Sequence, residues 1–157
     1  MHEQYANIIT ALPLFKGYTA QGAQRLINSG EVKEQAPGEL FFKEGDAPNG
    51  VLLVLTGKLQ VFVERKGEEF VLTDACPGTI LGELAVLCGI PRSASVRVLE
   101  PSTVLQWDAA AFRGLMLKDA FLSERIFRQS LRTLIEKEQS LIASLTESED
   151  AKSQTAN

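Results

Sequence analysis

The residues best suited to chemistry lie in one run, from Gly82 to Val96. Glu83 follows a glycine and starts a short apolar stretch typical of a one-turn helix, whose first amides have no intrahelical partner and can donate to an anion. Arg92, nine residues after Glu83, adds a planar guanidinium suited to a phosphate. Because a carboxylate would repel a phosphate, Glu83 is expected to accept from a sugar hydroxyl. Together these groups indicate a nucleotide site.

Composition places the run in a single ordinary domain. The chain has 157 residues, 45% hydrophobic and 23% charged, with a net charge of −4. This acidic balance, with a pI near 5.1, argues against a DNA-binding surface. Neither an apolar run of membrane-spanning length nor a signal peptide is visible, so we expect no membrane association and a cytoplasmic location.

Metal and catalytic sites have little support. Cys76 and Cys88 lack metal-ligand spacing and are expected to be buried thiols, and the single histidine is His2, at the terminus. We therefore predict no metal, no catalytic residue and no enzyme. The alternative of an enzyme on a metal-dependent β-barrel lacks the histidine cluster that it requires.

The elements that position the run begin with helices and continue with strands. Residues 5–29 predict two helices, the second with Thr19 as N-cap, and residues 31–108 predict an antiparallel barrel. The barrel strands are expected at 31–35, 40–43, 50–56, 58–64, 69–75, 79–81, 94–99 and 103–108. The fold class is thus α+β and mainly β, an eight-stranded jelly roll interrupted by the short helix, with Gly45 and Gly57 as turn glycines of positive φ.

Helices return after the barrel, over residues 109–145, with Asp108 as the first cap. Heptad-like spacing marks apolar residues of the last helix: Phe127, Leu131, Leu134, Leu141 and Leu145. They could pack on the chain's own barrel or form a homodimer, and the spacing does not choose. Residues 146–157 are polar and predict a flexible tail, so the domain is expected to span 1–145.

Two motifs together resemble the cyclic-nucleotide-binding domain family, over roughly residues 12–141. One is the Gly-Glu-Leu-Ala-Val-Leu…Pro-Arg-Ser-Ala-Ser-Val run, similar to the phosphate-binding cassettes of protein kinase A regulatory subunits, cyclic-nucleotide-gated channels and the bacterial catabolite activator. The other comprises residues 37–46 followed by residues 52–62. Two ordered motifs are far more specific than one glycine motif.

The resemblance implies a role for each cassette residue. Backbone amides would donate to the cyclic phosphate from Gly82, Leu84 and Ala85. Arg92 would pair with a phosphate oxygen, Ser93 would add a hydroxyl donor, and Glu83 would accept from the ribose 2′-hydroxyl and so reject deoxyribose. The nonfunctional alternatives are a Glu83 that stabilises a helix start and an Arg92 that pairs with it.

The identity of the base is less determined. The Arg92-Ser93-Ala94 order is closest to that of the bacterial activator and favours cAMP, with cGMP as the other candidate, since a serine can contact either base. The last helix is expected to cap the base, with Arg132 as first candidate and Thr133 or Glu136 as alternatives.

These expectations combine into a non-enzymatic cyclic-nucleotide sensor without a cofactor. Its last helix would rearrange and signal to a protein effector, and we expect no DNA-binding helix-turn-helix after that helix. The alternatives are the regulatory fragment of a larger channel or kinase-type protein, and a degenerate cassette that serves only as a protein-interaction module.

Overall fold

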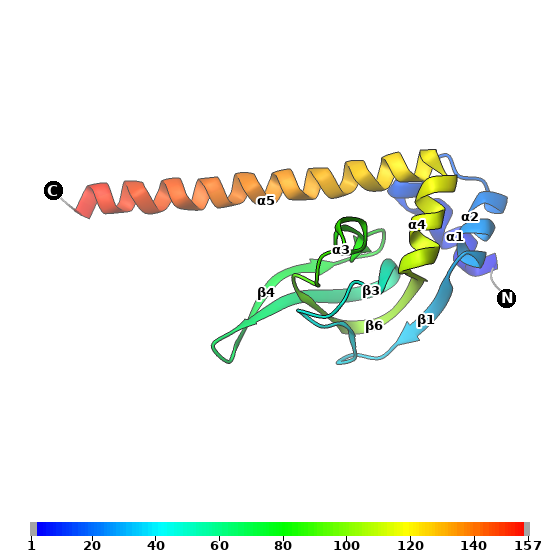
Figure 1. Ribbon diagram of the computed structural model, residues 1–157, viewed down its shortest axis with the longest axis horizontal. Helices are drawn as coiled ribbons and strands as arrows, with labels where there is room; N and C mark the ends of the chain where they lie inside the picture. The colour runs from blue at the N-terminus through cyan, green and yellow to red at the C-terminus, as the bar shows by residue number, and fades with distance from the viewer. Residues whose placement is uncertain (1–2, 156–157) are drawn as a thin grey trace.

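A computed structural model describes residues 3–155, and the expectation for His2 lies outside them. Helices precede and follow an antiparallel sheet along the chain, and one short helix interrupts its strands (Figure 1). The helices are α1 (Glu3–Ala11), η1 (Pro13–Phe15), α2 (Ala20–Asn28), α3 (Glu83–Cys88), α4 (Ala109–Lys118) and α5 (Ala120–Thr155). No helix of this described part is long and apolar enough to cross a membrane.

The sheet is antiparallel throughout and does not close into a barrel. Its strands are β1 (Glu31–Gln35), β2 (Leu40–Phe42), β3 (Gly50–Arg65), β4 (Glu68–Ala75), β5 (Ile80–Leu81) and β6 (Ser95–Asp108). The main path is β1-β6-β3-β4, with β2 paired to β6 and β5 paired to β3. The mainly β class is therefore confirmed, whereas the closed eight-stranded barrel is not.

The strand count falls to six because two pairs of predicted strands are continuous. Residues 50–64 lie in β3 and residues 94–108 in β6, and the two strands pair along their length with register shifts near residues 54–59. Gly57 has φ +87°, and an added Cβ would lie 2.4 Å from the Pro101 carbonyl oxygen. Gly57 and Pro101 thus face each other in a bulged strand pair, and β3 continues through Gly57, where a turn was predicted.

Local signals at two helix starts are confirmed. The Thr19 side chain accepts from the amide of Gly22 at 3.0 Å, and Asp108 accepts from Ala111 at 2.7 Å. Each side chain satisfies one of the free amides of a helix start. The positive φ expected at Gly45 and Gly57 is also observed.

Two apolar clusters divide the core. The larger one joins the helices to one side of the sheet and includes Ile9, Phe15, Leu26, Leu53, Trp107, Phe112, Leu122 and Ile126. The smaller one lies within the sheet and includes Phe42, Leu52, Val54, Leu59, Val96 and Val98. Because Leu122 and Ile126 are buried in the larger cluster, the first turns of α5 have a fixed position on the body of the protein.

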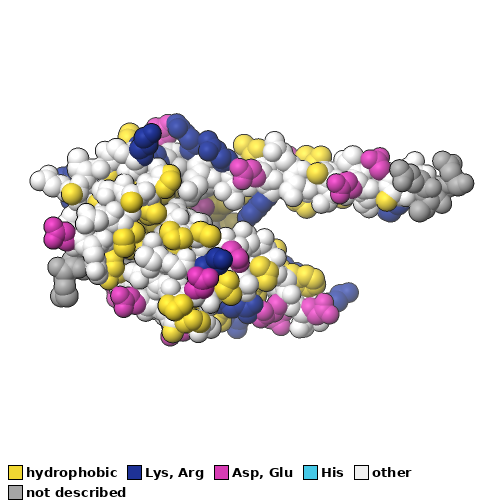
Figure 2. All heavy atoms as spheres, turned by 180° about the vertical axis from the view of Figure 1, so that it is seen from behind, with side chains coloured by type: hydrophobic (Ala, Val, Ile, Leu, Met, Phe, Trp, Pro, Cys, Tyr) yellow, Lys and Arg dark blue, Asp and Glu magenta, His cyan; other side chains and the backbone are white. Residues whose placement is uncertain are grey.

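The remainder of α5 departs from the sequence expectations. The helix continues to Thr155, so the predicted end at Leu145 is wrong; residues 146–155 contain no glycine or proline to stop it. Leu141 and Leu145 are 65% and 67% exposed, so they do not pack on the chain's own sheet. Figures 1 and 2 show this part of α5 extending away from the sheet, with apolar side chains along it.

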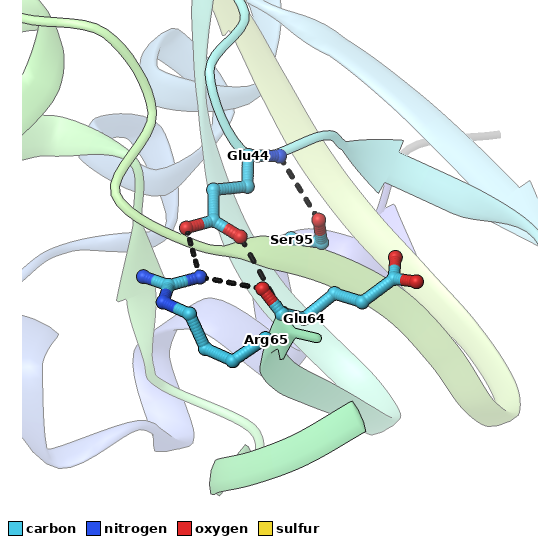
Figure 3. A network of polar contacts seen from close by, with 4 residues as sticks. All are labelled: Glu44, Glu64, Arg65 and Ser95. Carbon is cyan, nitrogen blue, oxygen red and sulfur yellow. Dashed lines mark hydrogen bonds and ion pairs between the residues drawn. The ribbon is translucent and has the colours of Figure 1, made fainter. Parts of the chain in front are cut away.

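A polar network holds the loop before β3 against the β3–β4 hairpin (Figure 3). The Glu44 amide donates to Ser95 Oγ at 2.9 Å, and the Glu44 carboxylate accepts from Arg65 at 2.8 Å. The neighbouring Gly45 and Asp46 exchange backbone hydrogen bonds with Arg92, both at 2.9 Å. The network therefore places the backbone of Arg92.

Candidate functional site

The cassette run borders one cavity of about 450 Å³, within the size range of small-molecule sites. The sheet contributes Phe42, Val61, Thr73, Asp74, Ala75, Thr79, Ile80, Leu81 and Val96. The cassette contributes Gly82, Glu83, Leu84, Ala85, Arg92, Ser93 and Ala94, and α5 contributes Gln129, Ser130, Thr133, Leu134, Glu136 and Lys137. The cavity thus lies between α3, the sheet and α5.

Gly82 shapes the entrance to α3. It is the N-cap, with φ +86° and no side-chain cap, and its carbonyl accepts the first helical bond from Val86 at 3.3 Å. The amides of Leu84 and Ala85, in the first turn, have no intrahelical acceptor. An added Cβ at Gly82 would lie 2.5 Å from Arg92 Nη1 and 2.8 Å from Phe42, so only glycine allows this close approach.

Arg92 is 4% exposed and is held in place by backbone and aromatic groups. Its guanidinium donates to the Gly82 carbonyl at 3.1 Å, the Gly50 carbonyl at 2.5 Å and Asn49 Oδ1 at 3.3 Å, and it lies 3.7 Å above the Phe42 ring. These bonds use three of its five N–H groups. Burial lowers the pKa of Arg92 and nearby Asp46 and Glu83 oppose this, but a guanidinium stays charged.

Glu83 is also buried, at 8% exposure, and carries a hydrogen bond from α5. Ser130 Oγ donates to Glu83 Oε1 at 2.8 Å. Burial raises the pKa of Glu83, while the Ser130 bond, its own amide, Lys137 and Arg92 act in the opposite direction. Its carboxylate is therefore an acceptor surrounded by donors and cations.

All the predicted cassette residues line the same cavity, whereas the predicted base cap, Arg132, lies outside it. Arg132 does not line the cavity; it borders a surface depression with Arg128, Leu131 and Ile135. Thr133 and Glu136, the alternatives, do line the cavity. The reason is helical periodicity: at 3.6 residues per turn, position 132 projects about 160° from Ser130, which contacts Glu83.

Several residues that line the cavity or hold Arg92 were not predicted. Phe42 and Asn49 hold Arg92 although they precede it by dozens of residues, and only the motif at residues 37–46 signalled the region. On α5, Ser130, Leu134 and Lys137 recur at the spacing of one helix face. That spacing could have identified them had the face of α5 toward the cassette been known.

The two cysteine side chains differ from expectation in their exposure. Cys76 and Cys88 are both exposed, so the prediction of buried thiols is wrong. Cys76 lies in the turn after β4 and Cys88 is the last residue of α3, so each thiol lies at the end of an element. Among residues 3–155 no group of three or more His, Cys, Asp or Glu side chains could hold a metal ion.

Comparison with known proteins decides the family. A family model described as the cyclic nucleotide-binding domain matches residues 32–119. The chain belongs to this family. The resemblance drawn from the cassette is thereby confirmed, and the part of the cavity lining that comes from the sheet and the cassette lies within the matched residues.

Individual relatives agree. The chain is 32% identical to the potassium channel KOR1 of Oryza sativa subsp. japonica over 71% of this chain and 13% of the channel. It is 29% identical to a cAMP-dependent protein kinase regulatory subunit of Blastocladiella emersonii over 75% of this chain and 30% of the subunit. The catabolite activator protein of Thermus thermophilus is structurally similar, with a TM-score of 0.73 and 25% identity over 82% of this chain and 61% of that protein. The chain thus spans less than a third of the two curated relatives.

Proposed function

We propose that this cyclic nucleotide-binding domain is a non-enzymatic, cytoplasmic sensor of cAMP. The observation that carries the proposal is the convergence of Glu83, Arg92 and the first turn of α3 on one cavity that α5 also borders. The kinase subunit among the relatives is cAMP-dependent by its description, which supports the choice of nucleotide. cGMP is the competing ligand.

The phosphate belongs at the start of α3. The amides of Leu84 and Ala85, the Ser93 hydroxyl and the two uncommitted N–H groups of Arg92 supply donors for the single charge of a cyclic phosphate. Glu83 then accepts from the ribose 2′-hydroxyl. A deoxyribose has no 2′-hydroxyl and would not form this hydrogen bond.

The base belongs against α5, where Thr133 and Glu136 replace Arg132 as capping candidates. The carboxylate of Glu136 can accept from the exocyclic amino group of adenine. Lys137, from the same helix, offers a donor to a ring nitrogen. These groups can pair with either purine, so the choice of adenine rests on the Arg92-Ser93-Ala94 order and on the cAMP-dependent kinase relative.

A calorimetric panel of cAMP, cGMP and a cyclic dinucleotide tests the proposal. We expect cAMP to bind with one site per chain and more tightly than cGMP, and the dinucleotide to be excluded because the cavity is about 450 Å³. A preference for cGMP would reverse the assignment of the base. The absence of binding by all three would favour a degenerate cassette that acts only as a protein-interaction module.

The signal would leave the domain through α5. Because α5 borders the cavity and extends beyond the sheet, a ligand that binds one α5 position better than another shifts the helix population. A 100-fold difference in affinity corresponds to about 2.7 kcal/mol. The receiver would be a protein effector. The second candidate, a regulatory segment of a larger channel or kinase-type protein, is supported by the short share of the relatives that the chain spans.

We also propose a homodimer formed through α5. Leu131, Leu141 and Leu145 are exposed at heptad-like spacing, and a second copy would cover them. We expect the double variant Leu141→Glu, Leu145→Glu to shift a dimer to monomer in sedimentation velocity without changing helix content by circular dichroism. The matched control is Glu147→Gln, Glu149→Gln on the same helix. A monomer for the unmodified chain, with and without cAMP, would exclude the dimer.

A further inference from the structure

Ser130 makes a contact that the cassette motif does not include. Its hydroxyl, on α5, donates to Glu83 Oε1, on α3, at 2.8 Å, and both residues are buried. The same two residues border the cavity. A residue of the signalling helix therefore contacts the carboxylate proposed to recognise ribose.

The geometry leaves room for a second donor on the same carboxylate. An ionised carboxylate has two oxygens and about four lone-pair sites, and Ser130 uses one of them at Oε1. We propose that Ser130 positions Glu83 to accept the ribose 2′-hydroxyl, so that discrimination between ribose and deoxyribose depends on α5 as well as on the cassette. This inference rests on the proposed function.

Electrostatics support the same role. The charged groups that act on Glu83 are Arg92 from the loop after α3 and Lys137 from α5. Glu136 from α5 and Asp74 from β4 line the same cavity. Burial raises the pKa of Glu83, and the Ser130 hydrogen bond opposes that rise. Without the hydroxyl the carboxylate would rotate more freely and protonate at higher pH, and a protonated carboxyl is a weaker acceptor.

The test compares cAMP with 2′-deoxy-cAMP by calorimetry for the full chain and for Ser130→Ala. We expect Ser130→Ala to bind cAMP about tenfold more weakly, because the lost hydroxyl orients the charged Glu83 carboxylate that accepts the hydrogen bond from the ribose. Binding of 2′-deoxy-cAMP, which does not use Glu83, should change by less than about twofold. The preference for ribose should therefore fall about tenfold.

Gln129→Ala is the matched control, since Gln129 also joins α5 to the rest of the domain, through the Gly78 carbonyl in the turn before β5 at 3.5 Å, and makes no hydrogen bond to Glu83. It should affect both nucleotides equally and leave the ribose preference unchanged. An unchanged preference in Ser130→Ala, or an equal loss of preference in Gln129→Ala, would overturn the role of Ser130 while leaving the proposed function intact. Failure of the unmodified chain to bind either nucleotide would overturn both.

The pH dependence is a second readout. We expect the ribose preference of Ser130→Ala to decline at a higher pH than that of the unmodified chain as the pH is lowered, since loss of the hydroxyl raises the pKa of Glu83. A residue that only held α5 in place would not shift this profile. Coincident profiles would therefore contradict the positioning role.

Discussion

Arg92→Ala is expected to weaken cAMP binding by about 10- to 150-fold, because a hydrogen bond from a charged donor contributes about 1.5–3 kcal/mol. The variant also removes the donor to the buried Gly50 carbonyl and the partly buried Gly82 carbonyl, as well as the contact with Phe42, so the unfolding temperature should also fall. Calorimetry at a temperature where circular dichroism shows the variant folded measures the binding effect.

Two further variants separate the causes of this loss. Arg92→Lys keeps a positive charge but lacks the fork that reaches both carbonyls, so it should bind more tightly than Arg92→Ala and more weakly than the unmodified chain. Arg97→Ala removes another arginine stacked on an aromatic ring, Phe62 at 4.1 Å, away from the cavity, and should leave binding unchanged. Undiminished binding in folded Arg92→Ala would show that the phosphate lies elsewhere.

Gly82→Ala is expected to produce the largest loss of stability of any single methyl addition in the cassette. The positive φ costs an alanine about 1–2 kcal/mol, and the crowding against Arg92 and Phe42 adds about 1–3 kcal/mol. For a chain of this size the unfolding temperature should fall by about 4–20 °C. Because the new methyl group would displace the Arg92 guanidinium, cAMP binding should fall too.

Gly89→Ala provides the matched comparison at the other end of α3. Gly89 also has a positive φ, +66°, but an added Cβ would have nothing within 4 Å. Its substitution should carry only the backbone cost and leave binding close to that of the unmodified chain. Thermal unfolding of the two variants side by side isolates the crowding, and equal losses would show that Gly82 matters only for its backbone angle.

Short-range sequence patterns predict the cassette and the helix starts. The glycine turn, the helix start at Glu83 and the arginine that follows are neighbours in sequence, so local geometry alone brings them near one another. The caps at Thr19 and Asp108 are local for the same reason. This explains why the whole cassette was predicted and was then observed around one cavity.

Long-range pairing decided the remainder. Eight predicted strands became six because β3 and β6 pair across the Gly57 turn signal, a contact between segments more than 40 residues apart. The exposed face of α5 depends on where Leu122 and Ile126 anchor the helix. A local pattern cannot report which segment will face a glycine or cover a leucine.

The residues of the Gly82–Val96 run carried enough information to predict an anion cassette and to indicate its family, because a tight turn, free amides and two opposite charges occur within fifteen positions. The partners of those charges came only from the tertiary structure. Asn49, Gly50 and Phe42 hold Arg92, and Ser130 holds Glu83, from positions that no spacing rule links to the cassette. The rotation of α5 about its own axis, set by the burial of its first turns, places Thr133 and Glu136 at the cavity and Arg132 away from it.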